Sequence, residues 1–234
     1  MTAFSDGDSA NVSPALRGNN AEARDETLAA LAATRTLRVA LLLFPDVEIL
    51  DFAGPYEVFS VASRVARRHF ALAHAAFEVD TIAVSPGVVR ARHGLDVVAR
   101  YGFETHPTAD LLLVPGGVVD APLAEARTIE WVRHTAANAR LTASVCTGAF
   151  VLGKAGLLRG RTATTHWEDL ADLRTALPDT NVVGDVPFVD AGTIVTSAGI
   201  SAGIGMSLHL VSRIMGQACA VATARQMQYD WQPV

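Results

Sequence analysis

Cysteine and lysine are scarce in this chain. Its 234 residues include two cysteines, Cys146 and Cys219, and one lysine, Lys154. The cysteines lie far apart in apolar segments, which argues against a disulfide scaffold and favours a reducing compartment. All other basic residues are arginines, which form no basic stripe, and the formal net charge is −5. We therefore expect a protein that does not bind nucleic acid.

Long apolar runs and a secretory signal are also missing. The strongly apolar stretches at residues 41–44 and 111–114 are strand-sized, whereas a membrane helix needs about 18 consecutive apolar residues. The first ten residues carry acidic groups where a signal peptide would have a basic start. These absences predict a soluble, cytoplasmic protein without membrane contact.

The composition allows one α/β domain, because half of the residues are hydrophobic and can bury a sizeable core. Residues 1–36 are rich in Ser, Asn, Asp, Gly and Ala. We interpret them as an N-terminal extension that is disordered at its start and contains one helix over residues 21–33. The folded domain is expected to span residues 37–234.

Strand and helix patterns alternate from residue 37 onwards, which predicts a mostly parallel sheet with helices on both faces. The predicted strands are residues 37–44, 77–84, 111–114, 141–146 and three short strands at 182–183, 188–189 and 193–196, with a hairpin at 88–98 broken at 93–94. The predicted helices are residues 54–68, 122–138, 149–155, 166–176, 202–215 and 218–229. Ligand sites in such sheets form beyond the carboxyl ends of the strands.

Cys146 stands at one of these ends, where a strand passes directly into a helix. A thiolate at such a corner is stabilised by the N–H groups and partial positive charge of the helix N-terminus, as expected for a nucleophile. Gly148 eases the crowded turn, much as small residues do around the serine of hydrolases. The alternative is that Cys146 is a small buried hydrophobe, the usual state of an isolated cysteine.

Asp51 is the candidate acid. It follows the first strand by a short loop and lies among apolar residues, a setting that raises a carboxyl pKa and suits proton transfer beside a thiolate. The alternative is that Asp51 caps the following helix. Glu48 competes for the same role, but we expect only one of the two to point inward and favour Asp51.

Gly116 and Gly117 follow the strand at 111–114. They can form a simple turn, or their bare N–H groups can join that of Thr147 in a pocket for developing negative charge.

His166 begins a predicted helix. It is a structural residue or, together with a cysteine, a proton carrier near neutral pH. The other histidines show no metal-ligand spacing, so we predict no structural zinc.

Two glycine-rich segments resemble nucleotide motifs without fulfilling them. Residues 148–154 match the first seven places of a P-loop, but Ala155 stands where a Ser or Thr would hold magnesium. Residues 199–205 lack the dinucleotide spacing and are interpreted as the closely packed entry of a helix that lines the site. We therefore expect no nucleotide and no other cofactor.

Five blocks in this order resemble the DJ-1/PfpI superfamily, and most closely its isocyanide hydratase-like branch. The resemblance covers residues 37–229. The blocks are LFPDVEILDFAGP at 43–55, VPGG at 114–117, SVCTG at 144–148, ATTHW at 163–167 and TSAGISAGI at 196–204.

The resemblance implies a flavodoxin-like three-layer sandwich that forms a homodimer and acts on a small molecule. It implies that Cys146 attacks the terminal carbon of an isocyanide to give a thioimidate, that Asp51 manages the protons, and that Thr147 shapes the site. Water then releases an N-substituted formamide. For this chemistry the helix terminus is expected to keep Cys146 ionised near neutral pH. His166, Trp167, Gly199 and Ile200 are expected to line the pocket.

Two departures from the family pattern bear on the function. Thr147 stands where protease-like relatives carry His, which disfavours peptidase chemistry, and Gly205 stands where the pattern usually has Asp.

The same blocks occur in the sensor domain of AraC-type regulators, whose helix-turn-helix module is not expected here. The alternative function is therefore a ligand-binding or redox-sensing protein without turnover.

Overall fold

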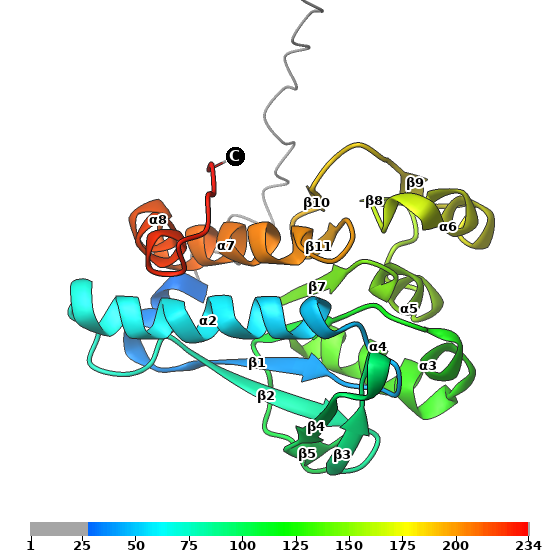
Figure 1. The fold of residues 1–234 in the computed structure, drawn as a ribbon, viewed down its shortest axis with the longest axis horizontal. Coiled ribbons are helices and arrows are strands. Elements are labelled where there is room, and N and C mark those ends of the chain that lie inside the picture. The colour runs from blue at the N-terminus through cyan, green and yellow to red at the C-terminus, as the bar shows by residue number, and fades with distance from the viewer. Residues whose placement is uncertain (1–27, 234) are drawn as a thin grey trace, which may run out of the picture.

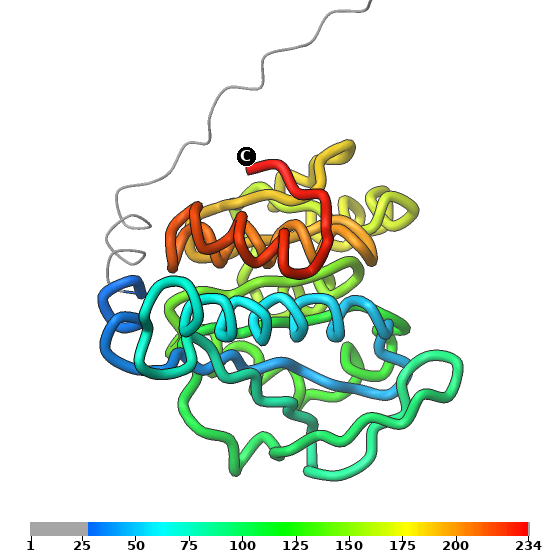
Figure 2. The backbone as a smooth tube through the Cα atoms, turned by 60° about the vertical axis from the view of Figure 1, so that its left-hand side comes forward, coloured from blue at the N-terminus to red at the C-terminus, as the bar shows by residue number. Residues whose placement is uncertain are grey.

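The computed structural model describes residues 28–233, which form three layers: a central sheet with a layer of helices on each face (Figures 1 and 2). The sheet has seven strands in the order β10-β11-β7-β6-β1-β2-β5. All neighbours are parallel except β10 and β11. The strands are β1 (Leu37–Leu42), β2 (Phe77–Ala83), β5 (Tyr101–Gly102), β6 (Leu111–Val114), β7 (Leu141–Val145), β10 (Phe188–Asp190) and β11 (Ile194–Ser197).

Helices cover both faces of this sheet. Helices α2 (Ile49–His69), α7 (Ala202–Met215) and α8 (Gln217–Gln226) pack together on one face, and α3 (Asp120–Ala124), α4 (Ala126–Asn138) and α5 (Gly148–Lys154) pack on the other. β6 and β7 are buried at every residue, because helices cover both of their sides. This arrangement confirms the predicted flavodoxin-like three-layer sandwich.

Smaller elements fill the connections. A hairpin of β3 (Gly87–Arg90) and β4 (Asp96–Ala99) encloses the short helix η1 (Arg92–Gly94), which confirms the interrupted hairpin expected at 88–98. The segment between α5 and β10 contains β8 (Thr162–Ala163), η2 (Trp167–Asp169), α6 (Leu170–Ala176) and β9 (Asn181–Val182). Within the described part of the chain, no helix has the length and apolar character needed to cross a membrane.

The strand register brings several connecting loops together. Val114 of β6 lies opposite Ser144 of β7, and Val145 of β7 lies opposite Ser197 of β11. The residues that follow these three strands therefore emerge side by side at one edge of the sheet. Val47, in the loop after β1, forms an isolated bridge with Gly117 and brings the start of α2 to the same place.

Three predicted helices begin or divide differently from expectation. α2 begins at Ile49 rather than near residue 54, so Pro55 lies inside the helix and not in its first turn. The helix expected at 122–138 is two helices, because Glu125 has an extended backbone and its side chain accepts the N–H of Arg127 to cap α4. The segment expected as one helix at 166–176 starts with the 3-10 turn η2.

The folded unit begins before residue 37. Residues 28–34 are helical, and Leu28 and Ala32 are almost fully buried. Arg35 pairs with Asp110 at 2.7 Å. These contacts make the described end of the predicted extension part of the core. Residues 1–27, which include the start of the predicted helix over 21–33, lie outside the described residues.

Candidate active site

Cys146 lies in the corner between β7 and α5. Its backbone has a φ of 55°, the left-handed region that side-chain-bearing residues seldom adopt. Its N–H points to the carbonyl oxygens of Ser197 and Ala198, and its carbonyl oxygen accepts the Thr165 hydroxyl at 2.9 Å. The residue is buried but retains 7% exposure. The fold therefore holds this cysteine in a strained and closely fixed position.

Gly148 makes the corner sterically feasible, as expected from the sequence. A Cβ atom at this position would lie against the carbonyl oxygen of Val114 and 2.8 Å from that of Pro115. Both obstacles are backbone atoms, which cannot turn aside as a flexible side chain can.

Asp51 is the third residue of α2, is fully buried, and reaches the loop after β6. Its Oδ2 accepts the N–H of Gly116 at 3.0 Å. Among residues 28–233, no N–H or O–H group reaches Oδ1. Asp51 therefore does not cap its helix, and the alternative considered from the sequence is wrong. The N-cap residue of α2 is Glu48, whose side chain makes no capping hydrogen bond.

Burial raises the pKa of Asp51 from 3.8 to about 7. The Gly116 N–H lowers this pKa, the negative charge of Glu48 raises it, and hydrogen bonding with the Cys146 thiol and the charge of Arg92 lower it. Near neutral pH the carboxyl group can therefore both hold and accept a proton, as the sequence predicted for an acid in an apolar setting.

The ion pair of Glu48 with Arg92 was missed from the sequence. Arg92 Nη1 lies 3.0 Å from Glu48 Oε2, and Arg92 belongs to the short helix inside the β3–β4 hairpin. The two charges act on the pKa of Asp51 in opposite directions. No local sequence signal joins residues 44 positions apart, so only the fold reveals this pair.

The pKa of Cys146 corrects the expectation that its thiol is ionised at rest. Burial and then the charge of Asp51 raise this pKa to about 12. The N–H groups of Thr147 and Ile200 bond to the sulfur and lower the pKa, but by less. The thiol is therefore neutral near pH 7, because the cost of a buried charge beside a carboxylate exceeds the stabilisation from two N–H groups.

Gly116 and Gly117 do not offer the free N–H groups expected of them. The Gly116 N–H bonds to Asp51, and the Gly117 N–H bonds to Thr147 Oγ1 at 2.9 Å. The Thr147 hydroxyl in turn donates to the Gly117 carbonyl at 3.0 Å. The interpretation of these glycine donors as an anion pocket is therefore wrong. The two N–H groups instead fix Asp51 and Thr147 to the loop that follows β6.

Gly116 sits between the two parts of this centre. A Cβ atom there would lie 2.6 Å from Thr147 Oγ1 and 2.8 Å from Asp51 Oδ2. Helices α2 and α7 approach closely at Gly54, where a Cβ atom would lie 3.0 Å from Ile204. Cys146, Asp51, Thr147, Gly116 and Gly117 thus form one compact centre.

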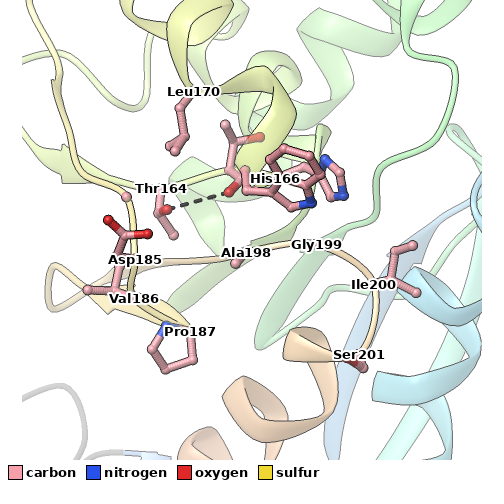
Figure 3. Close-up of a pocket in the computed structure, with 13 residues that line it drawn as sticks. Thr164, His166, Leu170, Asp185, Val186, Pro187, Ala198, Gly199, Ile200 and Ser201 are labelled. Atoms are coloured by element: carbon pink, nitrogen blue, oxygen red, sulfur yellow. Dashed lines mark hydrogen bonds between the residues drawn. The ribbon is translucent and has the colours of Figure 1, made fainter. Parts of the chain in front are cut away.

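His166, Trp167, Gly199 and Ile200 line a pocket of about 470 Å³ beside this centre (Figure 3). Neither Cys146 nor Asp51 is among the residues that line it. The His166 ring packs on Gly199, whose neighbour Ile200 has a φ of 50° and points its N–H to the sulfur. The expected lining residues therefore share a pocket, but the Gly199–Ile200 segment lies between it and the thiol.

Asp51→Asn should raise the melting temperature at about pH 8 by roughly 10 °C. Folding raises the carboxyl pKa from 3.8 to about 7, so the folded state binds a proton more tightly between these values. The free energy of unfolding therefore falls as the pH rises through this window, by up to about 4 kcal/mol, and asparagine removes this loss. Calorimetry of both proteins at several pH values measures the difference.

This difference should vanish below about pH 4, where Asp51 is protonated in both states. Asp120→Asn, at an exposed acid in α3, is the matched control and should change little. An equal gain at all pH values would contradict the assigned cause.

Comparison with known proteins places these features in a family. The model of the DJ-1/PfpI family matches residues 37–213. The isonitrile hydratase of Pseudomonas putida is 37% identical over 196 residues, which cover 82% of this chain and 78% of that protein. A crystal structure of a ThiJ/PfpI family protein from Pseudomonas syringae superimposes with a TM-score of 0.73 at 25% identity, over 96% of this chain and 84% of that one.

A transcription regulator is also similar. The HTH-type transcriptional regulator CdhR of Pseudomonas aeruginosa is 30% identical over 185 residues, which cover 79% of this chain. The chain spans about half the length of that regulator, since the match covers 53% of it. Similarity therefore extends to an enzyme over most of its length and to a regulator over one part.

Proposed function

The chain belongs to the DJ-1/PfpI family, and from this premise we propose that it hydrates an isonitrile, or a similar small electrophile, through a covalent bond to Cys146. The product would be an N-substituted formamide. Support comes from the similarity to isonitrile hydratase over most of both chains and from the compact centre around the cysteine.

The observation that carries the proposal is the buried pair of Asp51 and Cys146. A carboxyl group with no exposure, and with no N–H or O–H group at one oxygen, is costly to keep in a folded protein. A titratable group with a strongly raised pKa beside a thiol is a candidate for chemistry. This arrangement suits a reaction in which the thiol gives up its proton only when the electrophile is present.

In the first step Asp51, as the carboxylate, accepts the proton of the Cys146 thiol. The sulfur attacks the terminal carbon of the isonitrile and forms a C–S bond, and that carbon takes the proton back from Asp51. The result is a thioimidate on Cys146. The N–H groups of Thr147 and Ile200 stabilise the negative charge that develops on the sulfur during the transfer.

In the second step water adds to the same carbon, and Asp51 accepts one of the water protons and passes it to the nitrogen. The C–S bond then breaks as the carbonyl of the formamide forms, and the proton of the new hydroxyl group passes by way of Asp51 to the sulfur before the formamide leaves. One water is consumed for each isonitrile, and no oxidant or reductant is needed. Thr147 acts by holding the loop of Gly117 in place.

Turnover of a simple isonitrile over a pH series tests the proposal. Wild-type protein should convert cyclohexyl isocyanide to its formamide, followed by loss of the isonitrile and by product mass. The rate should rise with pH to a midpoint near 7, because below the Asp51 pKa the carboxyl group is protonated and cannot accept the thiol proton. Below this midpoint, kcat/KM should fall about tenfold for each unit by which the pH is lowered.

Failure to produce formamide at any pH would end the hydratase proposal and favour the sensor alternative, which the regulator similarity supports. The high thiol pKa argues against the redox form of that alternative, because peroxide reacts with the thiolate. The homodimer implied by the family resemblance and the cytoplasmic location predicted from the composition stay predictions.

A further inference from the structure

The pocket lined by His166 and Trp167 has the size of a ligand site in its own right. Its volume of about 470 Å³ lies within the range of small-molecule pockets. Three segments far apart in the sequence build it, namely residues 164–170, 184–187 and 198–201. Figure 3 shows Asp185 and Val186 on one side and His166 on the other, with Ala198 between them.

The walls combine an apolar body with few polar groups. Apolar side chains come from several sides, and the exposed residue Ser201 supplies a hydroxyl group. The apolar lining residues are Trp167, Leu170, Val186, Pro187, Ala198 and Ile200. Trp167 is 72% exposed, so its ring is available to a ligand.

Apart from His166, the charged side chain that lines the pocket is negative. Asp185 is exposed, lines the pocket and forms no ion pair among residues 28–233. Within the described part of the chain no lysine or arginine lines it, and Glu168 and Asp169 add carboxylates beside His166. Arg174, on the adjacent helix α6, is bonded to the carbonyl oxygen of Val182. An anion entering this pocket would meet repulsion, whereas a cation would meet an unpaired carboxylate and an indole ring.

We propose that this pocket is a second small-molecule site that binds an organic cation, with an ammonium group at Asp185 and an apolar body against Trp167 and Leu170. The site is separate from the reaction centre, because Cys146 and Asp51 do not line it. Gly199 and Ile200 form the wall that the two sites share. This inference does not depend on the hydratase activity.

Three probes with one phenyl ring test the charge preference. Benzylamine, benzyl alcohol and benzoate carry a cation, a neutral group and an anion, and each is titrated into the full chain by calorimetry and by ligand-observed NMR near neutral pH. Benzylamine should bind at least about tenfold more tightly than benzyl alcohol, and benzoate should bind most weakly. Equal affinity for benzylamine and benzoate would overturn the proposal.

Variants locate the binding. Asp185→Asn should remove the preference for benzylamine over benzyl alcohol, whereas Asp120→Asn, at an exposed acid on α3, should keep it. Val186→Trp should fill the pocket and abolish binding, with circular dichroism used to verify that the variant is folded. Retention of the preference in Asp185→Asn would overturn the assignment.

Cys146→Ala separates this site from the reaction centre. It should bind benzylamine with unchanged affinity, because Cys146 does not line the pocket. Loss of binding in this variant would place the cation in the reaction centre and refute a second site. Absence of hydratase turnover, in contrast, would leave the binding result intact.

Discussion

Isonitrile hydration should fall to the uncatalysed rate in Cys146→Ala and by about 10³-fold in Asp51→Asn. Alanine removes the atom that forms the covalent bond. Asparagine keeps the shape of Asp51 but cannot accept the thiol proton, whose removal is difficult because the pKa of Cys146 is raised to about 12. Steady-state kinetics at about pH 8, above the pKa of Asp51, measure both losses.

Cys219→Ala is the matched control for this experiment. Cys219 is the other free cysteine, is almost fully buried in α8, and has no part in the proposed reaction. Its loss should leave kcat/KM within about twofold. Because Cys146 and Asp51 act as one unit, the double variant should be no worse than Cys146→Ala alone. Equal turnover in wild type and Cys146→Ala would exclude covalent chemistry at this residue.

Gly148→Ala should destabilise the protein by about 3 kcal/mol or more and lower the melting temperature by roughly 10 °C. The added methyl group would press on the backbone carbonyls of Val114 and Pro115. Relief requires α5 to move away from β6, which would also displace Cys146. Thermal unfolding measures the loss, and turnover should fall with it.

Gly205→Ala provides the matched comparison for Gly148→Ala. Gly205 lies inside α7, and the nearest atom to an added Cβ is Trp231 Cδ1 at 4.0 Å. Alanine should therefore be neutral there or stabilise by up to about 1 kcal/mol, since it favours helix. A similar loss of stability in both variants would show that crowding at Gly148 is not the cause.

The secondary structure was predicted well where local patterns are strong. The predicted bounds of the strand at 111–114 and of the helix at 202–215 agree with the observed ones. A continuous apolar run between turn residues indicates the strand, and a long apolar segment after a glycine-rich turn indicates the helix. The start of α2 was predicted too late, because Pro55 is typical of the first turn of a helix, whereas α2 begins at Ile49.

The sequence also identified the principal groups of the candidate site. Cys146 and Asp51 were singled out by their positions after predicted strands, and the parallel register brings both to one edge of the sheet. The electrostatic state of the pair was not predictable in this way. The pKa of a thiol depends on burial and on charges that approach from other segments, such as Asp51.

By itself, the sequence determined the α/β class, the order of the elements and the identity of the cysteine and the acid, because these follow from local periodicity and from residues that stand at strand ends. Tertiary structure alone decided that the thiol is neutral, that the N–H groups of Gly116 and Gly117 are already bonded, and that Cys146 is not among the residues lining the pocket beside His166. Each of these depends on atoms from distant segments meeting within a few ångströms, and local sequence carries no record of those distances.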